Sequence, residues 1–386
     1  MKVMIASQGY PTKKYPMNGI HQFAYAKALK KHGVDTYVVA LDLRSFRRKR
    51  KWGYEEKIVD GIKTYAINIP LGNINQKLLC NIGAFFLKRK IDSILNKEKN
   101  TDIIHSHFTE PSYSFIKTIK DKKINIPVIV SEHSSSINKE DISHIRKDKL
   151  EVAKYVYNNC NELLVGSPFF QERMYKNFGV RPICTPTVAN TDVFTLNNYN
   201  FNKNIYRVIS TGNLKYEKGH RELIKAYGRV FRNINSELII FGEGEDREVL
   251  EELIKEEKIN HKVFLKGHKS IEEIAKEYNN GDLFVLASHS ETYGKAYIEA
   301  MICGLPVVTT RNGGSEHFIQ EFNGTIANVL DVNDLANKLE FMYNNRHKFN
   351  KKIISGYANR NFSEKASILE LKKIYSAVLR GEKYVR

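Results

Sequence analysis

The stretch DLFVLASHSETYGKAYIEAMICGLPVVTT, residues 282–310, decides the fold. Its apolar and polar pattern predicts a buried strand over Leu283–Ala287, a polar loop, a helix, and a second strand over Pro306–Thr309. Gly304 and Pro306 are expected to end that helix sharply. A strand, a helix and a strand in succession form the repeating unit of a parallel α/β sheet.

Two carboxylates, Glu291 and Glu299, bracket the corner where the loop enters the helix. We expect Ser290 or Thr292 to cap the helix, whose first amides and dipole would favour a phosphate. A helical rise of ~1.5 Å per residue separates the carboxylates by roughly 10–12 Å, about the length of a sugar–diphosphate–ribose ligand. Gly294 would let the backbone approach that ligand. Either glutamate alone would fit an ordinary amphipathic surface helix equally well.

Length and composition indicate a folded protein with two domains, because 386 residues exceed one ordinary core. The formal net charge of +18 suggests an anionic partner: nucleotide phosphates, an anionic membrane, an anionic glycan or nucleic acid. The four cysteines are far apart and show no metal-binding spacing, which is typical of reduced thiols in a cytoplasmic protein. We expect no signal peptide and no membrane span, so any membrane contact would be peripheral.

The rest of the chain predicts two sets of α/β units joined by a polar linker that ends near Lys203. We place the first domain at 1–195 and the second at 204–364. The strands expected in the first domain are 2–6, 36–40, 61–69, 102–107, 128–131, 162–166 and 182–185. Those expected in the second are 207–211, 237–241 and 262–265, together with the two of the opening stretch. Polar residues that follow strands are functional candidates in such sheets: His105, His107, Glu110, Glu132 and His133.

Glycines near two expected helix starts do not form a complete dinucleotide-binding motif. Gly19 opens the first helix, but no GxGxxG follows the first strand, so its amide could serve a ligand or a simple turn. Gly242 and Gly244 begin a GxG pattern in the second half, yet Arg247 stands where the third glycine is required. A nicotinamide-dependent dehydrogenase is therefore disfavoured.

The densest basic run is RSFRRKRK at 44–51, followed by Trp52. An apolar patch at 82–87 precedes further cations at 88–90. Cations interleaved with aromatic residues suit an anionic membrane surface, and no nucleic-acid-binding motif accompanies them. We therefore expect membrane contact rather than nucleic-acid binding.

Five segments together resemble the retaining family 4 glycosyltransferases of the GT-B architecture, of the type found in bacterial polysaccharide and glycolipid synthesis. They occur in family order and at family-like spacing: GNLKYEKG (212–219), IIFGEGEDR (239–247), VFLKGH (263–268), SETYGKAYIEAMICGLPVV (290–308) and NGGSEH (312–317). In the first half, Gly19 and the histidine of SEH (131–133) match more loosely. The resemblance implies two Rossmann-like α/β domains that face a central cleft, with the helix at 365–386 returning to the first domain.

The resemblance also assigns roles to residues. Glu299 would bind the ribose and Glu291 the donor sugar, and His133 would contact that sugar and be catalytic together with Glu291. The other donor-binding positions would be Gly19, Lys218, Gly267, Thr292, Tyr293 and Gly294. Asn213 departs from the family, since many members have arginine there; a second cation for the diphosphate must come from elsewhere, or Lys218 and the helix suffice.

The implied activity is transfer of a hexose-type sugar, with retention, from a UDP- or GDP-type nucleotide sugar to a glycan or lipid-linked acceptor in cell-surface polysaccharide biosynthesis. No Asp-x-Asp motif is present, so we expect neither a metal nor another cofactor. The expected location is cytoplasmic, with any peripheral membrane contact at the inner face of the plasma membrane. Two other readings stay open: a nucleotide-sugar epimerase of the same fold, and a basic membrane- or nucleic-acid-binding module without catalysis.

Overall fold

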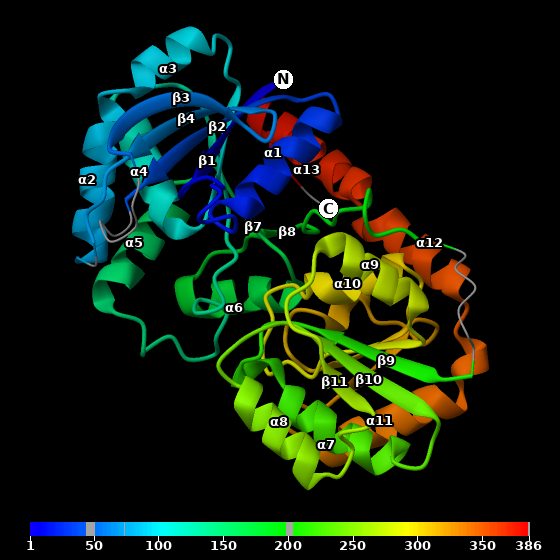
Figure 1. Cartoon of the computed structure of the whole chain (residues 1–386). Coiled ribbons are helices and arrows are strands. Elements are labelled where there is room, and N and C mark those ends of the chain that lie inside the picture. Colours follow the sequence, from blue (N-terminus) through cyan, green and yellow to red (C-terminus); the bar gives the residue numbers. More distant parts are fainter. Residues whose placement is uncertain (44–50, 73, 198–203, 385–386) are drawn as a thin grey trace. The chain divides into compact units, whose positions relative to one another are not determined.

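The computed structural model describes residues 1–43, 51–72, 74–197 and 204–384. These residues form two compact units, Met1–Val188 with Ser367–Arg386, and Ala189–Ala366. Each unit contains one sheet with helices on both faces (Figure 1). None of the helices within the described ranges has the length and apolar character needed to cross a membrane.

The first unit contains an eight-stranded sheet in the order β3-β4-β2-β1-β5-β6-β7-β8. Its strands, in chain order, are β1 (Lys2–Ser7), β2 (Asp35–Asp42), β3 (Gly53–Val59), β4 (Ile62–Asn68), β5 (Ile103–His107), β6 (Val128–Ser131), β7 (Glu162–Val165) and β8 (Ile183–Cys184). Neighbouring strands are parallel except for β3 and β4. The β3–β4 hairpin, which the sequence analysis did not predict, turns at Asp60 and Gly61, both with positive φ.

Alternation along β1 explains how both faces of this sheet are covered. Met4 and Ala6 pack on the side of α2, α4 and α5, whereas Val3 and Ile5 pack on the side of α1 and α13. The helices are α1 (Ile20–Lys31), α2 (Gln76–Lys88), α3 (Ile91–Lys97), α4 (Thr109–Asp121), α5 (Lys147–Tyr157), α6 (Pro168–Phe178) and α13 (Glu364–Leu379). Ile368, Leu371 and Tyr375 of α13 are buried in this core, which anchors the end of the chain to the first unit.

The second unit contains a six-stranded parallel sheet in the order β11-β10-β9-β12-β13-β14. Its strands are β9 (Tyr206–Thr211), β10 (Ser236–Phe241), β11 (Val263–Leu265), β12 (Leu283–Val285), β13 (Val307–Thr310) and β14 (Gly324–Ala327). Its helices are α7 (His220–Phe231), α8 (Arg247–Glu256), α9 (Ile271–Asn280), α10 (Lys295–Ile302), α11 (Val332–Asn344) and α12 (Lys351–Phe362), with short 3₁₀ turns at Tyr216–Lys218, Glu316–Phe318 and Arg346–Lys348. Helices α7, α8 and α11 cover one face, and α9, α10 and α12 cover the other.

The opening stretch forms the strand, loop, helix and strand that its pattern predicted, with two differences. Strand β12 ends at Val285, two residues before the predicted end. Helix α10 begins at Lys295, and its N-cap is Gly294 rather than Ser290 or Thr292. Gly294 has a φ of 83°, a left-handed conformation in which glycine is favoured, and an added Cβ would lie 2.8 Å from the Tyr297 ring. The chain therefore turns into the helix on a glycine, and the predicted side-chain cap was wrong.

Candidate functional site

The carboxyl ends of β9, β11 and β12 meet at one edge of the second sheet, because these strands are parallel. Lys218 follows β9, Gly267 follows β11, and Glu291 follows β12. The structure thus brings three donor-site residues predicted from the sequence to the same edge. Helix α10, with Glu299, begins directly after the loop that carries Glu291.

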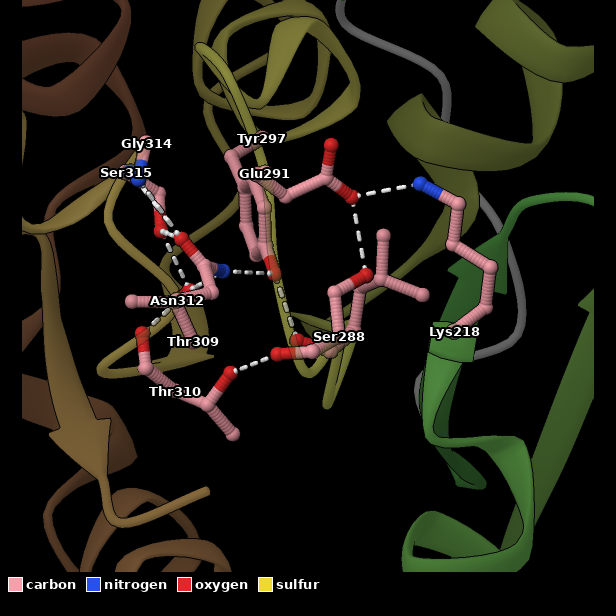
Figure 2. Close-up of polar contacts among 10 residues, drawn as sticks. Lys218, Ser288, Glu291, Tyr297, Thr309, Thr310, Asn312, Gly314 and Ser315 are labelled. Carbon is pink, nitrogen blue, oxygen red and sulfur yellow. Dashed lines mark hydrogen bonds and ion pairs between the residues drawn. The ribbon is translucent and has the colours of Figure 1, made fainter. Parts of the chain in front are cut away.

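Glu291 is held by two side chains (Figure 2). Its Oε1 lies 2.7 Å from Nζ of Lys218 and accepts a hydrogen bond of 2.8 Å from Oγ of Ser288. The Lys218 side chain is 25% exposed and that of Glu291 15% exposed, so the ion pair is only partly screened by solvent. An anion that displaced Glu291 from Lys218 would find a cation already in place.

The start of α10 lies close to this ion pair in the sequence and offers main-chain amides. No side chain caps the helix among the residues that the structure describes, and its first turn contains no acidic residue. The N-terminal amides of a helix, with the helix dipole, attract anions. Thr292 is partly buried and Tyr293 is buried, with its ring 6.0 Å from that of His317. The main-chain amides of these two residues are therefore better placed than their side chains to bind an anion.

Glu299 lies in the second turn of α10 and is largely buried. Burial raises the pKa of this carboxyl, and Lys295 at 3.3 Å partly opposes the rise by favouring the charged form. Lys295 is the first residue of α10. The corner therefore carries a second cation besides Lys218, which the sequence analysis missed although the pair has the i,i+4 spacing of a helical ion pair.

Asn312 supports the loop that carries Glu291 and was also missed (Figure 2). Its carbonyl oxygen accepts a hydrogen bond from the Glu291 amide at 2.9 Å. Its Nδ2 donates to Oη of Tyr297 and Oγ1 of Thr309, and its Oδ1 accepts from the amides of Gly314 and Ser315. Asn312 is 3% exposed. An asparagine followed by two glycines after a strand, as at residues 312–314, is the signal of an Asx turn.

Gly267 follows β11 and Gly19 precedes α1, and both have a positive φ. A Cβ added to Gly267 would lie 2.7 Å from Oε1 of Glu243, and one added to Gly19 would lie 2.3 Å from the carbonyl oxygen of Gly9. Gly19 is the N-cap of α1 with a φ of 69°. No larger residue fits at Gly19 without a backbone shift.

In the first unit, the predicted residue His133 follows β6 and is half-buried. Its Nε2 lies 3.1 Å from Nδ1 of His107, and its ring is nearly parallel to those of His107 and His21, with centroids 5.3 and 5.4 Å away. Burial, followed by the charges of His21 and His105, lowers the pKa of His133 well below its ordinary value. His133 is therefore a neutral imidazole at physiological pH.

Of the other polar residues predicted at strand ends, Glu132 has the clearest structural role. Its Oε1 accepts hydrogen bonds from the amides of His133 and Ser134 at 2.9 and 2.8 Å, and its Oε2 accepts one from Oη of Tyr157 at 2.8 Å. Burial raises its pKa to about 7. Glu132 thus holds the backbone that carries His133, whereas Glu110 lies in the first turn of α4.

Among the residues that the structure describes, no three His, Cys, Asp or Glu side chains gather in a way that could hold a metal ion. The groups at the second unit's sheet edge are a lysine, carboxylates and main-chain amides, which can bind phosphate and hydroxyl groups without a metal.

Two family models match the chain in succession. The model described as Glycosyltransferase Family 4 matches residues 19–190, and the model described as Glycosyl transferases group 1 matches residues 194–360. An uncharacterised glycosyltransferase of Methanocaldococcus jannaschii is 26% identical over 295 residues, which are 74% of this chain and 78% of that protein.

Solved structures of similar fold cover the whole chain. The sucrose-phosphate synthase of Thermosynechococcus elongatus superimposes with a TM-score of 0.78 at 18% identity and covers 99% of this chain and 100% of that one. The HepE protein of Anabaena, in complex with UDP and glucose, superimposes with a TM-score of 0.72 at 16% identity and covers 98% of this chain and 100% of that one. At these identities the likeness concerns the fold.

Proposed function

The chain belongs to the group 1 glycosyltransferases of the family 4 type, and from this premise we propose that it transfers a hexose-type sugar, with retention, from a nucleoside-diphosphate sugar to a glycan or lipid-linked acceptor of the cell surface. Its GT-B fold and its hexosyltransferase class follow from the family. The donor, the stereochemistry and the acceptor are the parts that we propose.

One observation carries the donor proposal: Lys218, Glu291 and the glycine-capped start of α10 occupy one sheet edge, with Glu299 in the next helical turn. In the proposed complex the diphosphate lies at the α10 amides beside Lys218. Lys295 is the second cation and replaces the arginine that many family members have at the position of Asn213. Glu291 then turns to hydroxyls of the donor sugar, and Glu299 binds those of the ribose. A pyrophosphate carries the charge needed to compete with Glu291 for Lys218.

This arrangement suits departure of a nucleoside diphosphate. As the bond from the anomeric carbon to the phosphate oxygen breaks, negative charge grows on the diphosphate, where Lys218, Lys295 and the amides of α10 would stabilise it. The acceptor hydroxyl attacks the same face of the sugar and passes its proton to the departing phosphate, so the configuration is retained. His133 contacts the sugar, and Gly19 lets the first unit's backbone approach the phosphates.

A donor screen tests the proposal. Thermal unfolding is followed with UDP-, GDP-, ADP- and dTDP-sugars, and a donor at ~100 times its Kd should add about 2.7 kcal/mol of stability. The variant Lys218→Met should lose most of that gain, whereas Lys338→Met, at a partly exposed lysine of α11, should keep it. Products are then analysed by mass spectrometry and NMR. An isomerised nucleotide sugar formed without acceptor would contradict the transferase proposal and support the epimerase, and an inverted linkage would contradict retention.

We also propose that the acceptor is met at an anionic membrane surface, which the first unit contacts through α2. Leu78 and Phe85, seven residues apart on this helix, are 52% and 50% exposed. The guanidinium of Arg89 lies 4.2 Å from the centre of the Phe85 ring, and Lys88 and Lys90 flank it and are exposed. Apolar side chains edged by cations are suited to the headgroup region of an anionic bilayer. Most of the basic run predicted for this role, residues 44–50, lies outside the described residues.

Liposome flotation tests the membrane surface. The protein should float with vesicles that contain phosphatidylglycerol and much less with neutral phosphatidylcholine vesicles. Leu78→Glu with Phe85→Glu should abolish flotation, and Phe341→Glu, at a 48% exposed aromatic residue of the second unit, should not. Equal flotation with both vesicle types, or of all variants, would contradict the proposed surface.

A further inference from the structure

The first unit contains a column of stacked imidazoles that extends beyond His133. His105 and His107 of β5 have ring centroids 4.4 Å apart, and His107 and His133 have centroids 5.3 Å apart at an interplanar angle of 11°. The His21 ring of α1 is nearly parallel to that of His133, with centroids 5.4 Å apart. Strand β5, the segment that follows β6, and helix α1 thus bring these rings together.

The hydrogen bonds in this column are unevenly distributed. His105 is bonded at both ring nitrogens, Nδ1 to Oη of Tyr375 at 2.6 Å and Nε2 to Oγ of Ser131 at 2.8 Å. His107 is completely buried, with Nδ1 at 3.1 Å from Nε2 of His133, and its own Nε2 has no hydrogen-bond partner within the described part of the chain. A buried polar atom without a partner requires an explanation.

The position of one proton accounts for the bare nitrogen. A neutral imidazole has one N–H donor and one lone pair, so the pair His107 and His133 can share their hydrogen bond in two ways. If His133 donated from Nε2, the proton of His107 would be on its own Nε2, as a buried N–H without an acceptor. If His107 donates from Nδ1, only a lone pair is left unpaired, and orphaned buried N–H groups are the rarer case.

We propose that His107 is a positioning residue for His133: its Nδ1–H donates to Nε2 of His133, fixes the plane of that ring, and places the single proton of His133 on Nδ1. His133 then presents a neutral N–H donor at Nδ1. Such a group can hydrogen-bond a sugar hydroxyl oxygen without gaining or losing a proton during transfer. This inference rests on the proposed function for the role of His133, although the protonation pattern itself does not depend on it.

The protonation pattern can be measured in the wild-type protein without any substrate. Protein labelled with ¹⁵N-histidine is studied by long-range ¹H–¹⁵N correlation, in which a protonated ring nitrogen is separated from a bare one, with His133→Asn used to assign the signals. The expected result is a protonated Nδ1 and a bare Nε2 for His133. A protonated Nε2 on His133 would overturn the inference whatever the enzyme's activity.

Two substitutions of His107 test its consequence for turnover. An asparagine side-chain nitrogen takes a place similar to that of Nδ1, so His107→Asn should keep kcat within about threefold, whereas His107→Leu should lower kcat about tenfold, as expected for ~1.4 kcal/mol of lost positioning. The KM for the donor should change less than twofold in both. Equal kcat in the two variants would overturn the positioning role.

The proposed function and this inference fail in distinguishable ways. If His133→Ala keeps full activity, the assigned role of His133 is wrong, but the proton on Nδ1 is still measured by NMR. If His107→Leu does not fold, the spectrum of the wild-type protein still decides. If His107 only filled space, any difference in kcat between the two His107 variants would follow the difference in their midpoints of thermal unfolding.

Discussion

The two units place different chemistry at the carboxyl ends of their sheets. In the second unit, Lys218 and Glu291 form an ion pair 2.7 Å long beside the start of a helix. In the first unit, His133 stacks among imidazoles whose burial lowers the pKa of His105 to about 3 and keeps His107 and His133 neutral. The same kind of parallel sheet therefore supports a charged site in one unit and an uncharged one in the other.

The proposed function assigns the two units to different parts of a nucleotide sugar. A pyrophosphate is an anion, which the lysine cation and the main-chain amides at a helix start attract. A hexose has no charge and is recognised by neutral donors and acceptors, for which a fixed imidazole is suitable. The comparison predicts that the rate of sugar transfer is most sensitive to loss of charge in the second unit. In the first unit it should be most sensitive to the orientation of the imidazole ring.

The largest effect is expected at Glu291. Glu291→Ala removes the group proposed to bind the donor sugar and leaves Lys218 without its partner, so kcat should fall about 100- to 1,000-fold. Glu291→Gln has a side chain of the same shape and keeps an acceptor for Ser288. Its kcat should therefore lie between those of the wild type and Glu291→Ala. Glu340→Ala, at an exposed glutamate of α11, is the control. Rates within threefold of the wild type, measured at saturating donor, would contradict the charged site.

His133→Ala is expected to have the next largest effect. Loss of the neutral donor should lower kcat about 30- to 100-fold, within the range of a single positioned catalytic group. Because the pKa of His133 is far below its ordinary value, the wild-type rate should not show a histidine titration between pH 6 and 8. A sharp loss of rate with a midpoint near pH 6.5 that disappears in His133→Ala would show that the imidazole is not held neutral.

Local sequence patterns predicted much of the sheet framework. Strand β6 has the predicted bounds, Val128–Ser131, and Ser167 caps the helix that begins at Pro168, because apolar runs and capping residues act over a few positions. The hairpin of β3 and β4 was missed although Asp60-Gly61 is a strong turn signal, since the strand before it alternates only weakly in burial. Helices α2 and α3 were missed as well; only an apolar patch was recognised there.

The site was harder to predict because its supports are distant in the sequence. Glu291, Glu299 and Lys218 were identified from local patterns and a resemblance; Glu291 and Lys218 lie at one sheet edge, and Glu299 lies in the second turn of α10. Asn312 holds the Glu291 loop from beyond the next strand, and His107 bonds a ring 26 positions away. Such pairs form only when the strands are placed side by side, so no local pattern reveals them.

A smaller effect is expected at Glu299. Glu299→Ala should weaken donor binding about tenfold, the cost of losing one hydrogen bond to a charged group, ~1.5 kcal/mol. At saturating donor, kcat should stay within about twofold, because the ribose contact is the same before and during transfer. Isothermal titration with the donor found in the screen measures this, and an unchanged Kd together with a lower kcat would move Glu299 from donor binding to catalysis.

The smallest effect on turnover is expected at Glu132→Gln, which separates positioning from charge in the first unit. Glutamine keeps an oxygen for the amides of His133 and Ser134, so kcat should stay within about twofold.

Because burial raises the pKa of Glu132 to about 7, the protonated carboxyl adds to the free energy of unfolding of the wild-type protein at low pH. That contribution is lost as the pH rises from about 4.5 to 7. Glutamine does not titrate, so the variant should become the more stable protein by about 1–3 kcal/mol over this interval and keep the advantage above it. Urea unfolding at pH 5, 6, 7 and 8 measures the difference, with Glu340→Gln as control. A stability difference that is constant with pH would mean that the carboxylate of Glu132 is charged throughout, and the first unit would then not be the uncharged counterpart of the second.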